Sequence, residues 1–120
     1  MPHLTATVTA VTYNGDCIDR VQVAVRGCNL DTYPDNFCYN IEMSRGEYIG
    51  LKKHGFLLFA QHGCAVVPIS YIAIGENRYL RTDDNDNPKD DLGNVFTDHV
   101  WTMYSFETLK TNLRICNIYL

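Results

Sequence analysis

Alternating polar and apolar residues at the start of the chain predict a β-hairpin. Threonines alternate with alanine and valine over residues 4–13, which is the period-two pattern of a half-buried strand. Asn14-Gly15 follows at once, and this pair is typical of a type I′ turn because both central residues of that turn need a positive φ. Three valines at one parity continue the pattern over residues 17–26. We therefore predict two antiparallel strands joined at Asn14-Gly15.

A capping box predicts one short helix. Ser44 is followed three residues later by Glu47, and in this spacing each side chain accepts a hydrogen bond from the backbone N–H of the other residue. Tyr48 and Leu51 would share one face of the helix, and Gly55 can adopt the positive φ that ends it.

The other elements follow from apolar runs and turn-forming residues. Strands are predicted at residues 56–61, 64–74, 78–82, 95–104 and 115–120, with 56–61 and 64–74 as central strands. Residues 105–114 fit either a short helix or a turn. Residues 27–37 and 83–94 are rich in Asp, Asn and Pro and are predicted loops. Pro68 lacks an N–H group, so we expect it at a bulge or a sheet edge.

These elements predict a single α+β domain over residues 1–120, formed by a mainly antiparallel sheet or a partly closed roll with one short helix. A formal charge of −4 and a pI near 5.4 argue against direct nucleic-acid binding, which depends on clustered Lys and Arg. Five cysteines at irregular spacing, without a secretory leader or a membrane-length apolar run, indicate a reduced, cytoplasmic protein.

Short motifs between residues 44 and 92 follow the predicted hairpin. They are Arg45, Gly55, Tyr79-Leu80-Arg81-Thr82 and Asp90-Asp91-Leu92. Their order resembles a family of small, uncharacterised bacterial and phage domains, in which the last motif is Asp-Asn-Leu. The resemblance implies an α+β fold. It implies no catalytic residue, because the family has no settled activity.

The sequence lacks residues that two common kinds of metal site require. Asp83, Asn85 and Asn87 occupy the first, third and fifth places of a calcium loop, but Pro88 stands where glycine is needed and Asn94 where glutamate is needed. The chain also lacks the closely spaced Cys or His pairs of a structural zinc site. We therefore predict neither a metal nor a cofactor.

Histidine and cysteine side chains offer one alternative site. His62 and Cys64 are two residues apart, so they point to the same side of an extended chain. Together with His54 and Asp98 they could line a pocket for a small ligand or for acid–base chemistry.

Surface loops provide the favoured site. Aromatic residues in predicted loops and turns are typical of binding surfaces, and they are Tyr13, Tyr33, Phe37, Tyr39 and Tyr104. The predicted binding surface combines tyrosine with acidic loop residues and consists of Tyr33, Asp35, Asp83, Asp84, Asp86, Asp90 and Asp91.

The resulting hypothesis is a non-enzymatic interaction module that binds a protein partner and no membrane. Its concrete form is a phage or mobile-element inhibitor or adaptor, whose carboxylates occupy a basic site on a host defence protein. The alternative is the small-ligand protein or enzyme with the His/Cys/Asp pocket. A third hypothesis is a homo-oligomer formed through an exposed strand edge.

Overall fold

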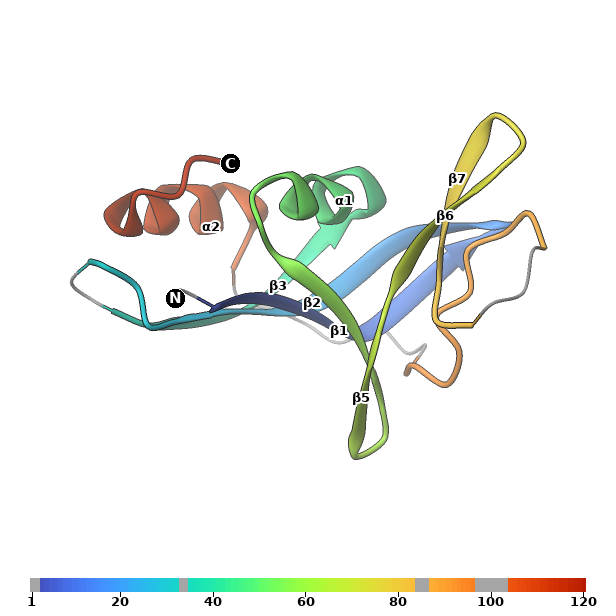
Figure 1. Cartoon of the computed structure of the whole chain (residues 1–120), viewed down its shortest axis with the longest axis horizontal. Coiled ribbons are helices and arrows are strands. Elements are labelled where there is room, and N and C mark those ends of the chain that lie inside the picture. The colour runs from blue at the N-terminus through green and yellow to red at the C-terminus, as the bar shows by residue number, and fades with distance from the viewer. Residues whose placement is uncertain (1–2, 33–34, 84–86, 97–103) are drawn as a thin grey trace.

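A computed structural model describes residues 3–32, 35–83, 87–96 and 104–120. Within these ranges the chain forms a five-stranded sheet, a separate two-stranded hairpin and two α-helices (Figure 1). The strands are β1 (His3–Asn14), β2 (Cys17–Cys28), β3 (Phe37–Ser44), β4 (Leu57–His62), β5 (Ala65–Pro68), β6 (Ser70–Ile74) and β7 (Asn77–Arg81). The helices are α1 (Arg45–Lys53) and α2 (Phe106–Leu113), and a 3₁₀ turn (Arg114–Cys116) follows α2. Neither α1 nor α2 has the length and apolar character that crossing a membrane requires.

The large sheet has the strand order β3-β2-β1-β4-β5, and β6 pairs with β7 outside it. Neighbouring strands are antiparallel except β1 and β4, which are parallel. The α+β, sheet-rich prediction is confirmed, and most of the strand pairs are antiparallel as predicted. Two corrections are needed, because the described residues form two helices where one was predicted and the large sheet is mixed. The physical reason is α1, which carries the chain from β3 past β2 and β1, so that β4 runs parallel to β1.

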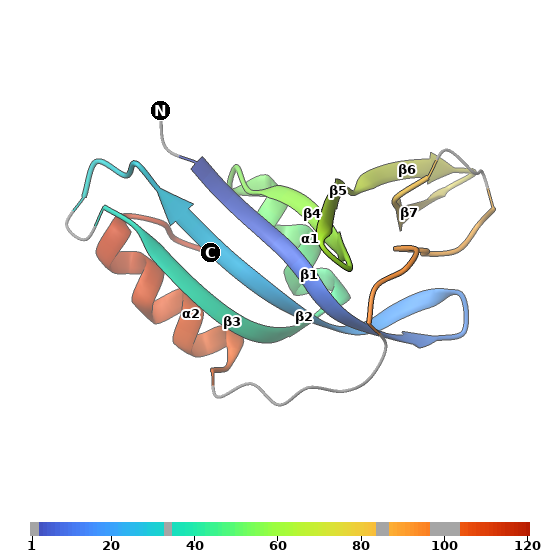
Figure 2. The same ribbon diagram turned by 90° about the horizontal axis from the view of Figure 1, so that it is seen from below.

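Both helices of the described chain cover the same face of the five-stranded sheet (Figures 1 and 2). The face seen in Figure 2 carries no described helix. The apolar core therefore lies between the sheet and the layer formed by α1 and α2.

The first hairpin has the predicted strands and a turn that is shifted by one residue. Asn14 pairs with Cys17, so the two loop residues are Gly15 and Asp16. Gly15 has a φ of 64°, while Asp16 is not among the residues with a positive φ. Glycine at the first loop position is the arrangement of a type II′ turn rather than the predicted type I′.

A β-bulge interrupts the alternation of β1 at Thr9. Val8 pairs with Val23 and Ala10 pairs with Gln22, which leaves Thr9 as the additional residue. Before the bulge even-numbered residues such as Val8 face the core, whereas beyond it the odd-numbered Val11 is buried and only 1% exposed.

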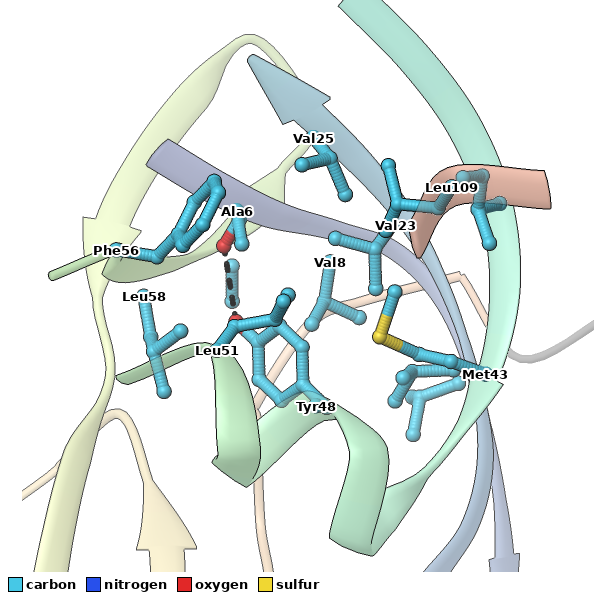
Figure 3. Packing of buried hydrophobic residues seen from close by; sticks show 14 of the residues in the cluster. Ala6, Val8, Val23, Val25, Met43, Tyr48, Leu51, Phe56, Leu58 and Leu109 are labelled. Atoms are coloured by element: carbon cyan, nitrogen blue, oxygen red, sulfur yellow. Dashed lines mark hydrogen bonds between the residues drawn. The ribbon is translucent and has the colours of Figure 1, made fainter. Parts of the chain in front are cut away.

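Helix α1 begins at the predicted capping box and contributes two buried side chains to the core. Glu47 N donates to Ser44 Oγ (3.2 Å), and Ser44 N donates to the Glu47 carboxylate (2.9 Å). Tyr48 and Leu51 are completely buried beneath β1 (Figure 3). The Tyr48 hydroxyl donates to the Ala6 carbonyl (2.9 Å), shown as a dashed line in Figure 3, so its polar end is satisfied inside the core.

Several predicted elements differ from the structure. Residues 37–44 form β3, so Phe37 and Tyr39 lie in a strand and not in a loop. Residues 64–74 are not central strands, because β5 is at the sheet edge and β6 belongs to the second sheet. Pro68 does end an edge strand, as predicted. The strand predicted at 115–120 is wrong, because this segment begins as the 3₁₀ turn and Asn117 then has a φ of 59°. Most of the strand predicted at 95–104 lies outside the described residues.

Candidate functional site

The structure divides the predicted binding surface between two ends of the molecule. Strand β2 has twelve residues, so its ends are roughly 35 Å apart. Asp35 lies in the loop between β2 and β3, beyond one end of β2. The segment after β7, which carries Asp83 and Asp91, lies beside the turn of the β1–β2 hairpin at the other end (Figure 2). Tyr33, Asp84, Asp86 and Asp98 lie outside the described residues.

Asp90 is buried and cannot belong to a binding surface, which corrects the prediction. The residue is 3% exposed. One carboxylate oxygen accepts from Ile18 N and Arg45 Nε (both 2.7 Å), and the other accepts from Leu80 N (2.9 Å) and Arg45 Nη2 (3.1 Å). All four acceptor positions are therefore occupied by the protein itself. Hydrogen bonding to Asp90 also raises the pKa of the Arg45 guanidinium.

Arg81 forms a second ion pair next to the first, in which only the arginine is buried. It is 1% exposed, and its guanidinium donates to both oxygens of Asp83 (2.7 and 3.1 Å) and to the Lys89 carbonyl (3.0 Å). Asp91 Oδ2 lies 3.7 Å from Arg81 Nη2. We call Arg45, Arg81, Asp83, Asp90 and Asp91 the arginine–aspartate cluster.

The cluster accounts for motifs that the sequence analysis singled out without a role. The Tyr-Leu-Arg-Thr and Asp-Asp-Leu motifs are eight or more residues apart in sequence, and Arg45 is farther away still. In the fold they meet where the loop after β7 lies against the β1–β2 hairpin. Their shared role in this chain is structural, because they supply internal ion pairs and hydrogen bonds.

A group of exposed carboxylates lies over the cluster. Asp90 N donates to the Asp16 carbonyl (2.8 Å), which fixes the loop beside the hairpin turn. Asp16 and Asp19 are exposed, and the side chains of Asp83 and Asp91 are 52% and 39% exposed. We call Asp16, Asp19, Asp83 and Asp91 the acidic end. Sequence reasoning missed Asp16 and Asp19, although two acidic residues at a hairpin turn were a visible signal.

The alternative His/Cys/Asp pocket is not assembled from the described residues proposed for it. His54 lines a cavity between α1 and the C-terminal residue Leu120, whereas His62 lines a different cavity beside β1. Cys64 is exposed in the β4–β5 turn and is not among the described residues that line either cavity. Within the described ranges, no three His, Cys, Asp or Glu side chains are placed to hold a metal ion.

The chain matches no protein-family model, no curated protein and no solved structure. The family resemblance therefore stays a prediction.

Proposed function

We propose that the protein is a non-enzymatic interaction module that binds a basic protein partner through the acidic end. One observation carries the proposal: two segments about seventy residues apart are locked together with their carboxylates facing solvent. The main counter-charge, Arg81, lies beneath them and is almost inaccessible. Cations are also present at this end, because Lys89 and Arg78 are exposed and the Arg45 side chain is 25% exposed, so the surface is acidic but not uniformly so.

Rigidity makes this surface suitable for binding. The hydrogen bonds that the Asp90 carboxylate accepts from Ile18 N and Leu80 N hold the loop in place before a partner arrives. A pre-ordered surface loses less conformational entropy on binding than a loose loop would. Exposed carboxylates also increase the rate of association with a positively charged partner.

The resemblance to phage domains suggests what kind of partner this is. A host protein that binds nucleic acid has a basic surface for phosphates, and grouped carboxylates can occupy such a surface. The proposal therefore includes inhibition, in which the acidic end competes with nucleic acid for a host protein.

The test uses a charge change that leaves the arginine–aspartate cluster intact. The double variant Asp16→Asn with Asp19→Asn removes two carboxylates from the acidic end and changes the formal net charge of the chain from −4 to −2. The matched control, Asp31→Asn with Asp35→Asn, makes the same charge change in the loop at the opposite end. Each protein is immobilised and used to capture partners from a bacterial lysate at low and high salt.

The proposal expects one protein that is retained by the wild type and the control, lost from the acidic-end variant, and released by salt or by competing DNA. Equal retention by both variants would contradict the role of the acidic end. So would a partner that stays bound at high salt, or the absence of any retained protein at low salt.

A further inference from the structure

A cavity of about 770 Å³ opens beside the bulge of β1, and none of the acidic end's carboxylates is among its described lining residues. Its described lining comes from three separate segments and consists of Thr9, Gln61, His62, Gly63, Asn94 and Phe96. This volume falls within the ~300–1,000 Å³ typical of small-molecule sites. Bulges also occur often next to functional sites, because they redirect side chains.

One wall of the cavity is fixed by close contacts. His62 Nε2 lies 2.6 Å from the Leu92 carbonyl, and a carbonyl only accepts, so Nε2 carries the proton. In the neutral ring Nδ1 is then an acceptor. Gly93 has a φ of 72°, and a Cβ atom at this position would lie 2.9 Å from the His62 ring. Leu92 N also donates to the Tyr13 hydroxyl (3.1 Å), which ties the same segment to β1.

An aromatic ring also lines the cavity. Phe96 is 60% exposed, although a phenylalanine would normally be buried. Its position is set by its backbone, because Val11 N donates to the Phe96 carbonyl (2.8 Å). The ring is therefore held at the surface with most of its area available for stacking.

The free polar groups of the cavity can both donate and accept. The Asn94 amide has no hydrogen-bond partner among the described residues, and Gln61 uses only its Nε2 group, which donates to the Gly63 carbonyl (3.2 Å). Asn94 thus offers one donor and one acceptor, while Gln61 Oε1 and His62 Nδ1 accept. The described lining contains no Lys, Arg, Asp or Glu side chain.

We propose that this cavity binds an uncharged, planar heteroaromatic ring of the nucleobase type. The ring stacks on Phe96, and its edge pairs with the Asn94 amide, since a side-chain amide matches the donor–acceptor edge of adenine. The cavity is a second site and does not depend on the acidic end, so either proposal can fail without the other.

The test titrates the full chain with adenosine, with cytidine and with glucose as a carbohydrate probe, and follows backbone amide shifts by NMR. Wild type is expected to bind adenosine saturably below about 1 mM, with the largest shifts at residues 61–63 and 92–96. Phe96→Ala should weaken binding by about tenfold or more, because stacking on an aromatic side chain commonly contributes that much. Asn94→Ala should also weaken it by about tenfold, because pairing of a side-chain amide with a base edge contributes a similar amount. Tyr119→Ala removes an aromatic side chain that is 63% exposed elsewhere and should leave the affinity unchanged.

Asn94→Ala protects the test against misfolding, because it changes an unpaired side chain and should retain the wild-type NMR spectrum. Absence of saturable nucleoside binding would overturn the proposal. Preferential binding of glucose would also overturn it, as would unchanged affinity in folded Phe96→Ala or Asn94→Ala.

Discussion

Replacing Asp90 by alanine tests whether the arginine–aspartate cluster anchors the fold. The change removes the acceptor of two backbone N–H groups, those of Ile18 and Leu80, and these residues are 4% and 0% exposed. A buried donor without a partner costs about 1–3 kcal/mol. Arg45 would also lose its carboxylate, but its side chain is 25% exposed, so solvent limits that loss to about 1 kcal/mol or less.

The expected loss is therefore about 2–7 kcal/mol, a range that includes the roughly 3–5 kcal/mol cost of breaking a buried ion pair elsewhere. Small domains are stable by only about 5–15 kcal/mol, so the effect is a large fraction of the total. Asp90→Asn should not rescue stability. Each carboxylate oxygen of Asp90 accepts from two donors, so the amide nitrogen of asparagine would face two donors in either orientation.

Urea unfolding followed by far-UV circular dichroism gives the free energy of unfolding for each variant. Asp19→Asn is the control, because it removes an exposed carboxylate and should change stability by no more than about 0.5 kcal/mol. Arg45→Lys gives a milder loss if Asp90→Ala does not fold, because lysine cannot form the two-pronged contact. Losses below about 1 kcal/mol for both Asp90 variants would refute the anchoring role.

Three further substitutions test the helix, the core and the sheet. Burial raises the pKa of the Tyr48 hydroxyl above its usual 10.0, so the contribution of Tyr48 to stability should be constant below pH 10 and fall above it, because only the unfolded chain then loses that proton. Tyr48→Phe should flatten this decline in urea-unfolding experiments between pH 9 and 11, and an unchanged slope would contradict the assignment. Ser44→Ala removes the helix cap and should cost about 1 kcal/mol in the same assay, whereas no loss would mean that the cap is dispensable. Gly27→Ala would drive a methyl group into the Phe37 ring and should lower stability by about 1–3 kcal/mol, and a stable variant would show that the ring can move.

Local signals account for the parts of the fold that the sequence predicts well. The first hairpin follows from period-two alternation, and α1 follows from the Ser44 and Glu47 pair, because these patterns act between residues close in sequence. Strand β3 had the same kind of signal: Phe37, Tyr39 and two further apolar residues alternate with polar ones. The Asn-rich loop before it obscured that pattern. Helix α2 also had a local signal in its N-cap Ser105, whose side chain accepts from Thr108 N (3.2 Å).

Contacts between distant segments account for what the sequence did not predict. The parallel pairing of β1 with β4 depends on where α1 carries the chain, and no local pattern encodes it. Asp90 is the corresponding case for the site. Its neighbours in sequence are polar and typical of a solvated loop, and Arg45 is 45 residues away. Its burial becomes visible only when both segments are placed.

The division of the acidic residues into two roles changes how function can be tested. Neutralising the whole loop would remove Asp90 together with the exposed carboxylates, so lost binding could reflect a lost fold. Asp16 and Asp19 carry charge at the same end without an ion pair among the described residues. A loss of binding in their double variant, with unchanged unfolding energy, would therefore assign the effect to surface charge. The buried carboxylate holds the acidic end in place, and the exposed ones are left to meet a partner.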